Sequence, residues 1–456
     1  MGRSSLPAVL IFLLLALVWN ASARGQDRDT TWVMTFDHDF YNWATPHIQT
    51  FEFPAGGQSW SQILLFYTIE CPESPGDCDP WDRLGHIRVV TEDSTAGEVH
   101  YEIARIVTPY DITGSGYPGS CTWIIDVSDY ETLLQGSVTL RSYIESWIGG
   151  DRGWIVTARF GFVPGDKELM PYRITNLWAS DYLVFGDPSR PIEDVLIPLD
   201  VALDADAVAF KVVAAVTGHG QGNTDNAAEF ARKWHEVVAN GTAYGHYLWR
   251  ANCANNVCSP QRGTWYYSRA GWCPGKDVRP WSADITPSVT PGTVISIDYD
   301  IEAYENFCRP NNPACQDGVT CGDCDYNYEG HTEPNFCFNA QLIHYRQIPS
   351  EVAGDFGPSA DRLELAACRP NPFVGSTVIP YRLSAAGVVT ISICAPDGRM
   401  IRALSRRHAA GGEFACRWDG RDEDGRVAAA GIYFYTLRAA GEAEGTAETR
   451  KMIRLQ

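Results

Sequence analysis

Basic residues are scarce in this sequence. Its 456 residues include 36 Lys and Arg against 56 Asp and Glu, which gives a formal net charge of −20. Nucleic-acid binding depends on Lys and Arg that neutralise phosphates, so this balance argues against a nucleic-acid partner. It also argues against docking on an anionic membrane surface. Residues 361–456 carry +3 and residues 1–360 carry −23, which indicates at least two independently composed parts.

Common catalytic motifs are missing as well. The chain has no Gly-x-Ser-x-Gly, no His-Glu-x-x-His and no Walker loop. Its 10 His are scattered singly, without a His-x-His pair, which weighs against a metal site built from His. We therefore expect neither a metal nor another cofactor.

Long apolar runs are lacking beyond the first residues. Arg3, the apolar stretch Leu6–Trp19 and the small residues Ala21-Ser22-Ala23 have the pattern of a secretory signal peptide over residues 1–23. The alternative is a membrane anchor, but the stretch is shorter than the ~20 residues that span a bilayer. We expect a protein without a membrane span after cleavage, located outside the cytoplasm: secreted, periplasmic or on a bacterial cell surface.

Cysteine, by contrast, is plentiful, and 14 Cys in an exported chain indicate disulfides. Cys71 and Cys78 could close a short loop. Other cysteines fall into two groups, Cys253, Cys258 and Cys273, and then Cys308, Cys315, Cys321, Cys324 and Cys337. A zinc or redox site at Cys321-x-x-Cys324 is an alternative, but staples suit an exported loop better. The pairing stays open, and Cys121, Cys368, Cys394 and Cys416 have no obvious partners.

Most of the chain has the pattern of short strands. Segments such as Ile87–Val90 and Val138–Tyr143 alternate or carry β-branched and aromatic residues between turn formers. Helical patterns are few, and the best runs from Asn226 to Val238. Many short strands without alternating helices predict an all-β protein of antiparallel sandwiches or jelly rolls.

We divide the chain into three folded parts. The first spans residues 31–164 and the second residues 167–349. A linker rich in Gly, Ser, Pro and acidic residues follows at 350–361. The last part, residues 363–456, is small and basic.

The last part has motifs of its own. They are Arg369-Pro370-Asn371-Pro372-Phe373, the hairpin turn Asp397-Gly398 and Trp418-Asp419-Gly420. In these it resembles the immunoglobulin-like C-terminal modules of secreted bacterial proteins, similar to the flagellar hook-capping fold and type-A sorting domains. The resemblance implies a partner in the secretion machinery and delivery to the cell surface or medium. An accessory sandwich without a sorting role is the alternative.

Carboxylates beside aromatic and basic residues are the candidates for chemistry. Asp82 lies between Trp81 and Arg83, where it could be a tuned base, although a surface ion pair is the simpler interpretation of these residues alone. Glu145 and Trp147 are two apart and would share one face of a strand. Two further candidate segments are Thr217–Gly220 with Asn226–Phe230, and Ser268–Gly275.

Together these segments resemble the peptide:N-glycosidase F family, bacterial enzymes that release N-linked glycans from asparagine. The resemblance covers residues 34–348 and is densest in the first half. Its motifs are Thr35-Phe36-Asp37, Glu70-Cys71-Pro72, Cys78–Arg83, Tyr101–Arg105, Tyr143–Trp147, Gly218-His219-Gly220, Ala228-Glu229-Phe230 and Arg269–Gly275.

The resemblance implies two adjacent eight-stranded antiparallel jelly rolls with the active site between them, followed here by the small C-terminal sandwich. It implies an amidase that hydrolyses the β-aspartylglucosamine bond of N-linked glycoproteins or glycopeptides. The carbohydrate would leave as an amine and asparagine would become aspartate. We expect a monomer.

Site residues follow from the same resemblance. The catalytic carboxylates fall on Asp82, Glu145 and Glu229, and the substrate-binding positions on Arg83, Trp147, His219, Arg269 and Trp272. Trp147 and Trp272 offer flat faces for sugar rings. The disulfides that the resemblance implies pair Cys71 with Cys78 and Cys253 with Cys273.

Departures from the family bear on specificity. Ala227 and Ala231 flank Glu229 where a disulfide stands in the best-known member, so this loop is either looser or braced in another way. Two other functions stay open: a glycan-binding or adhesion protein on the same scaffold, and a copper monooxygenase. The second needs clustered His ligands.

Overall fold

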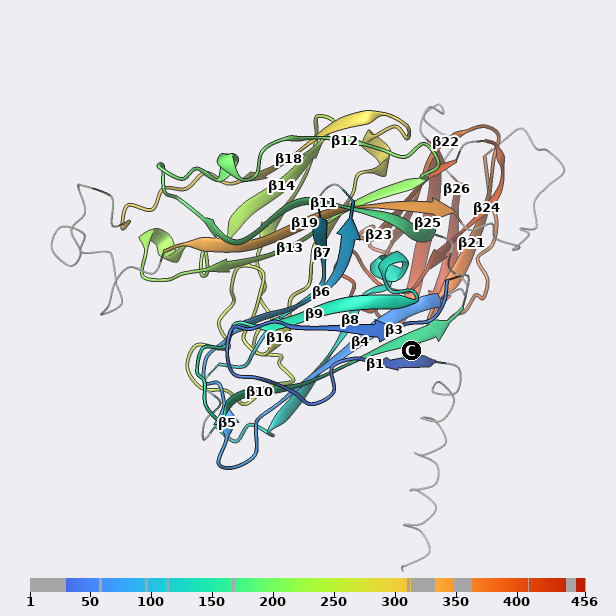
Figure 1. Ribbon diagram of the computed structural model, residues 1–456. Coiled ribbons are helices and arrows are strands. Elements are labelled where there is room, and N and C mark those ends of the chain that lie inside the picture. Colours follow the sequence, from blue (N-terminus) through green and yellow to red (C-terminus); the bar gives the residue numbers. More distant parts are fainter. Residues whose placement is uncertain are drawn as a thin grey trace, which may run out of the picture.

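Strands dominate the computed structural model, shown in Figure 1. It describes residues 30–56, 60–94, 97–110, 115–165, 169–309, 333–347, 363–408, 410–439 and 448–455, with the single residues 112, 167 and 312. The predicted signal peptide, the linker and most of the third cysteine group lie outside these residues. Within them, no helix is long and apolar enough to cross a membrane.

The first sandwich packs two sheets face to face, antiparallel apart from one short parallel pair of strands, β5 with β10. The strands of one sheet are β1 (Thr31–Met34), β10 (Arg152–Pro164), β4 (Trp60–Glu70) and β8 (Ser120–Asp126), with the short β2 (Asp39–Tyr41) and β5 (Asp77–Cys78) pairing β10. The strands of the other are β7 (Gly97–Val107), β6 (Leu84–Asp93), β9 (Ser137–Ile144) and β3 (His47–Glu52), with β16 (Lys276–Asp277) at its edge. Strands β4, β8 and β9 alternate between buried and less buried residues, as half-buried strands do.

The second sandwich has two four-stranded sheets. One contains β11 (Leu169–Val184), β19 (Asn335–Gln347), β13 (Ala209–His219) and β17 (Trp281–Asp284), and the other β12 (Leu199–Ala202), β18 (Val294–Ile301), β14 (Lys233–Ala239) and β15 (Thr242–Leu248). Figure 1 shows this sandwich against the first. The expected fold class, all-β with adjacent antiparallel sandwiches, is confirmed.

Strand β19 explains why the two sandwiches form one body. Eleven successive residues of it, from Asn335 to Tyr345, are buried. Phe336 and Phe338 pack in the core of the second sandwich, whereas Ile343 and Tyr345 belong to the core of the first. Because successive side chains point to opposite faces of a sheet, this one strand contributes to both cores.

The predicted helix from Asn226 to Val238 is wrong. Residues Thr224–Asn226 form a single 3-10 turn, and Lys233–Ala239 is strand β14, paired with both β15 and β18. The turn between β14 and β15 is Asn240-Gly241, both with positive φ, the two-residue hairpin geometry that this dipeptide favours. Pairing on both sides outweighs any weak helical pattern.

The third sandwich is small. Its strands are β20 (Glu364–Leu365), β21 (Thr377–Leu383) and β24 (Gly412–Trp418) in one sheet, and β23 (Met400–His408), β22 (Gly387–Cys394), β25 (Gly431–Ala439) and β26 (Glu448–Arg454) in the other. The predicted Asp397-Gly398 turn joins β22 to β23, with Gly398 at φ 83°. The motif residues Phe373 and Trp418 pack edge to face in the core, 5.5 Å apart. This sandwich docks on the second, because the backbone N–H of Arg407 donates to the carbonyl of Val208 at 2.9 Å.

A buried cation crosses the junction between the first two sandwiches. Arg105, on β7, is 1% exposed; its Nε donates to Glu102 Oε1 at 2.6 Å and its Nη1 to the carbonyl oxygen of Cys337 on β19 at 2.7 Å. Arg88 donates from Nη2 to Glu102 Oε2 at 3.3 Å and to Asp181 Oδ1, on β11, at 2.6 Å. Pairs of buried charges are costly to break, so this network fixes how the sandwiches meet.

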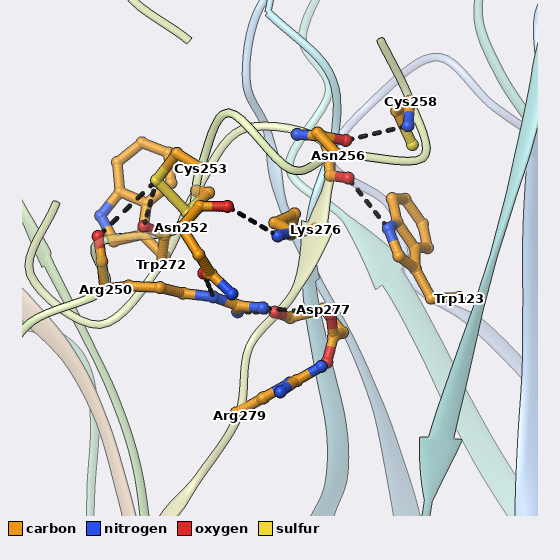
Figure 2. Close-up of polar contacts among 12 residues, drawn as sticks. Trp123, Arg250, Asn252, Cys253, Asn256, Cys258, Trp272, Lys276, Asp277 and Arg279 are labelled. Carbon is orange, nitrogen blue, oxygen red and sulfur yellow. Dashed lines mark hydrogen bonds and ion pairs between the residues drawn. A yellow bond between two sulfur atoms is a disulfide. The ribbon is translucent and has the colours of Figure 1, made fainter. Parts of the chain in front are cut away.

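A long excursion from the second sandwich reaches over the first. We call it the strap, residues 249–280, between β15 and β17. Its strand β16 pairs with β7, and Cys258 forms a disulfide with Cys121 of β8, 137 residues away. Figure 2 shows the polar contacts that hold it, among them the Trp123 indole donating to the Gly275 carbonyl at 3.0 Å and Lys276 Nζ donating to the Asn252 carbonyl at 2.9 Å.

The Cys121–Cys258 disulfide joins two parts that the sequence separates. Cys121 has no obvious partner in the sequence and Cys258 has nearer cysteines in Cys253 and Cys273, so the observed pairing requires the strap to lie across β8. Two other pairs, Cys71–Cys78 and Cys253–Cys273, are the ones that the family resemblance implies. A crosslink between distant residues restricts the unfolded chain and therefore stabilises the fold.

Replacing Cys121 and Cys258 together by Ser should lower the free energy of unfolding by about 3 kcal/mol, because a long loop of the unfolded chain is no longer closed. Urea unfolding followed by tryptophan fluorescence measures the change. Cys394→Ser is the control, since Cys394 forms no disulfide and is only partly buried. A double variant as stable as the control would contradict the strap's structural role.

Candidate functional site

The segment Asp79–Arg83 enters the junction from the first sandwich. It joins β5 to β6, next to the Cys71–Cys78 disulfide. Thr108, just after β7, fixes it: the backbone N–H of Arg83 donates to Thr108 Oγ1 at 2.7 Å, and Thr108 Oγ1 donates to the carbonyl oxygen of Trp81 at 2.9 Å. Asp82 therefore lies on a segment held at both sides, partly buried itself.

Arg83 does not pair with Asp82 as the simpler sequence interpretation has it. Its Nε donates to Oδ2 of Asp79 at 2.8 Å, and Asp79 is entirely buried. Among the described residues the ion pair of this segment is thus internal rather than on the surface. Asp82 keeps its carboxylate for other contacts.

Glu145 and Trp147 come directly after β9, the neighbour of β6. The backbone N–H of Glu145 donates to the carbonyl oxygen of Leu84 at 2.9 Å, continuing the β6–β9 pairing beyond its last pair, Gly85 with Ile144. This brings Glu145 to the same end of the sheet as Asp82. Trp147 is 56% exposed, so it can offer a flat face.

Glu229 and Arg269 enter the junction from the second sandwich. Glu229 follows the 3-10 turn Thr224–Asn226, and Arg269 lies on the strap. Arg269 Nε donates to Glu229 Oε1 at 3.0 Å, and its Nη1 donates to the carbonyl oxygens of Thr264 and Tyr267, each at 3.0 Å. Arg269 is 1% exposed, so it acts on Glu229 and the strap rather than as an open ligand group.

The Glu229 loop is braced without a disulfide at Ala227 and Ala231. The Ala270 N–H donates to the carbonyl oxygen of Glu229 at 2.8 Å, and the Gly218 N–H to that of Ala270 at 3.0 Å. Gly218 fits because a Cβ there would lie 2.3 Å from the carbonyl oxygen of Ala228. Backbone hydrogen bonds to the strap thus take the place of the disulfide that stands here in the best-known member of the family.

His219 and Trp272 form a tilted ring pair next to this loop. Their ring centroids are 5.0 Å apart, and His219 Nε2 shares a hydrogen bond of 2.8 Å with Thr217 Oγ1. Burial, with the charges of Arg105 and Arg269, lowers the pKa of His219 to about 3, so the ring is neutral near pH 7.

The open face expected for Trp272 is wrong. The side chain is buried, with 2% of the residue exposed, its indole N–H donates to the Gly218 carbonyl at 2.7 Å, and the Arg269 guanidinium lies over its ring at 5.0 Å. Trp272 therefore supports Arg269 and His219. Trp81, which was not predicted as a binding residue, is 51% exposed. Its ring centroid lies 6.0 Å from that of Tyr110.

The charge of one site carboxylate acts on another. Burial and the charge of Glu229 raise the pKa of Asp82 to about 7, against the lowering effects of Arg269 and Arg83. Burial likewise raises the pKa of Glu229, against the effect of Arg269. Burial also raises the pKa of Glu145, and Arg83 lowers it. The Glu229 charge thus acts on Asp82 from the second sandwich, and the Arg83 charge acts on both Asp82 and Glu145.

The remaining features of the site are polar supports. Asp79, Thr108 and Ser146 were not predicted as site residues. Asp79 and Ser146 stand inside the motifs Cys78–Arg83 and Tyr143–Trp147, but only the fold shows that they support Asp82 and Glu145. In the part of the chain that the structure describes, no three His, Cys, Asp or Glu side chains gather as metal ligands would.

This fold and site have known relatives. Residues 190–320, which include Glu229, Arg269 and Trp272, match the family model of the C-terminal domain of peptide-N-glycosidase F. The chain is 29% identical over 269 residues to peptide-N(4)-(N-acetyl-beta-D-glucosaminyl)asparagine amidase F of Elizabethkingia miricola, covering 56% of this chain and 72% of the relative. The sequence is therefore similar to peptide-N-glycosidase F over more than half of the chain.

Solved structures show the same fold. PNGase F, a glycosylasparaginase from Flavobacterium meningosepticum, superposes with a TM-score of 0.56 at 23% identity, covering 71% of this chain and 98% of that one. PNGF-II superposes with a TM-score of 0.53 at 13% identity, covering 74% and 68%. At these identities the likeness shows the jelly-roll fold alone.

Replacing Arg269 by Met should destabilise the protein more as the pH rises. Without the guanidinium, the buried Glu229 has a higher pKa in the folded state than in the wild type, so ionisation above its unfolded pKa of ~4.3 favours the unfolded chain. Lost hydrogen bonds to Thr264 and Tyr267 cost stability at every pH. We expect a stability loss about 2 kcal/mol larger at pH 8 than at pH 5 in urea unfolding.

The double variant Arg269→Met/Glu229→Gln is the control for this effect. It should show only the pH-independent loss, because no carboxylate remains to ionise. Equal losses at both pH values in the single variant would mean that Glu229 is not held as an ion by Arg269.

Proposed function

We propose that this chain is an amidase that hydrolyses the β-aspartylglucosamine bond of N-linked glycoproteins or glycopeptides. The observation that carries the proposal is the setting of Asp82: a partly buried carboxylate with a pKa of about 7, facing the Glu229–Arg269 pair. A general base works best with a pKa near the operating pH. The similarity to peptide-N-glycosidase F supports the type of bond.

The reaction needs water, a base and support for the leaving nitrogen. In our proposal Asp82 takes a proton from water, and the oxygen of that water bonds to the side-chain carbonyl carbon of the glycosylated asparagine. The carbon–nitrogen bond then breaks, and the proton returns to the nitrogen. The products are a glycosylamine and an aspartate. No other reactant is consumed.

Other groups assist in distinct ways. Glu229 would hold the amide or hand a proton to the departing nitrogen. Glu145 would orient water or the first sugar, with Arg83 near both first-sandwich carboxylates. Trp147 supplies the exposed ring for a sugar face. His219 is neutral, so it would bind by hydrogen bonding rather than by charge.

The proposal also covers the location of the protein, its substrates and the role of the third sandwich. We propose an exported monomer whose substrates are glycoproteins or glycopeptides. The third sandwich would serve as a sorting or anchoring module that secretion machinery reads. The third sandwich docks through Arg407 on the second sandwich. The residues of the proposed site come from the first two sandwiches.

Asp82→Asn should lower kcat at least 100-fold on an N-glycosylated peptide, because the variant lacks the base that activates water. The measurement is mass spectrometry of the products, in which Asn converted to Asp marks the reaction. Asp77→Asn is a matched control: it makes the same change five residues earlier, at a carboxylate that is 47% exposed.

Three results would count against the proposal. Wild-type protein that binds the glycan without an Asp-containing product would indicate a binding or adhesion protein. An Asp82→Asn variant with the wild-type rate would remove Asp82 from the reaction. Equal loss in Asp77→Asn would point to a general effect on the loop.

The rate should depend on pH through Asp82. Its ionised form is the base, so kcat/KM should fall as the pH drops below about 7, the pKa of Asp82. The charges that face it are Glu229, Arg269 and Arg83. Glu229→Gln removes the negative charge that raises this pKa and leaves Arg269 unpaired, so both effects should shift the acid limb to lower pH.

The comparison uses kcat/KM profiles of wild type and Glu229→Gln between pH 4.5 and 9 (chosen assay limits), with activity-independent unfolding curves to define the range in which both are folded. An acid limb that stays at the same pH in Glu229→Gln, or moves to higher pH, would show that Glu229 does not set the pKa of the base. A wild-type rate without any acid limb would remove the ionisation of Asp82 from the mechanism.

A further inference from the structure

Asp79 is a buried carboxylate with an unusual number of partners. It is 0% exposed, so it cannot touch a substrate. Its Oδ1 accepts from the backbone N–H of Trp81 at 3.0 Å, and its Oδ2 accepts from Arg83 Nε at 2.8 Å and from Ser146 Oγ at 2.7 Å. Its own N–H donates to the carbonyl oxygen of Gly153 at 3.2 Å, which fixes it to β10.

Two of these contacts hold the residues on either side of Asp82. Trp81 is bound through its backbone and Arg83 through its guanidinium, so Asp82 lies between two positions that Asp79 fixes. The Arg83 charge in turn lowers the pKa of both Asp82 and Glu145. Moving the guanidinium would therefore change the ionisation of two carboxylates at once.

The third contact reaches the other segment of the site. Ser146 lies between Glu145 and Trp147, so its hydroxyl ties that segment to the same carboxylate oxygen as Arg83. One carboxylate thus holds the Asp82 segment and the Glu145 segment in fixed relation. Asp82 and Glu145 are 63 residues apart in the sequence.

We propose that Asp79 is the positioning residue of the site, which sets the relative placement of Asp82, Glu145 and Arg83 without contacting substrate. The inference rests on the proposed function for its kinetic consequences. A buried charge needs a partner and hydrogen bonds, and Asp79 has both. An amide at this position would keep an acceptor for the Trp81 N–H, but would lose the ion pair with Arg83.

The test is Asp79→Asn, assayed for kcat, KM and the pH profile on an N-glycosylated peptide. We expect kcat to fall about 10- to 100-fold, since misplacement of a catalytic group by about 1 Å costs this much. The acid limb should move to higher pH, because Arg83 is no longer held where it lowers the pKa of Asp82. A residue that only stabilised the fold would not move the limb.

Two further variants sharpen the result. Asp77→Asn, two residues away and partly exposed, should keep the wild-type rate and limb. Ser146→Ala removes one arm of the network and leaves the Asp79–Arg83 ion pair, so the rate should fall several-fold with the limb in place. This second variant decides the question if Asp79→Asn does not fold.

The outcomes separate this inference from the proposed function. Folded Asp79→Asn with the wild-type rate and limb would overturn the positioning role, as would an unfolded Asp79→Asn beside a fully active Ser146→Ala. If the wild type has no amidase activity, the proposed function fails, and a crystal structure of Asp79→Asn then decides the positioning role. Displacement of Arg83 and Asp82 supports it, and unchanged positions overturn it.

Discussion

The whole arrangement depends on Arg105, the buried cation between the first two sandwiches. Its guanidinium pairs with Glu102 on its own strand and donates to the carbonyl oxygen of Cys337 on the facing sheet. Asp82 and Glu145 come from one sandwich and Glu229 from the other, so their distances are only as well defined as this junction. A buried charge has few acceptable positions, because any shift leaves it without a partner in a medium of low dielectric constant. The same charge adds to the burial that keeps His219 neutral, so one residue contributes to both the geometry and the electrostatics.

Much of the fold could be predicted from the sequence. Alternation of apolar and polar residues marked strands such as β9, and the dipeptide Asp397-Gly398 marked a hairpin. The failure at Asn226–Val238 has a definite cause: β14 is short, and pairing with β15 and β18 decides its structure, which no local pattern records. Asn240-Gly241 carried the missing signal, since this pair favours a two-residue turn between strands. The burial of β19 on both faces could not be predicted, because it depends on the position of the first sandwich.

The charged residues of the candidate site could be predicted from the sequence more readily than the residues that hold them in place. The family resemblance selected Asp82, Glu145 and Glu229, and in the structure the charge of Glu229 raises the pKa of Asp82. Burial could not be inferred: Trp272, which was expected to be open, is covered by Arg269, whereas the exposed Trp81 was not selected. Asp79 was invisible for a different reason. Arg83 is only four residues away, but Ser146 lies near Asp79 because β6 and β9 pair, and no spacing along the chain reveals a contact between strands.

The strap has a consequence for how any large molecule approaches the junction. It is joined to the second sandwich at both ends and to the first by a disulfide, by β16 and by the Trp123–Gly275 hydrogen bond. Opening the sandwiches like a hinge would break all three, so rigid-body closure around a ligand is not available to this chain. Adaptation of shape must then come from the other molecule. A flexible partner would lose conformational entropy on binding, whereas a rigid one would be accepted only if it already fitted.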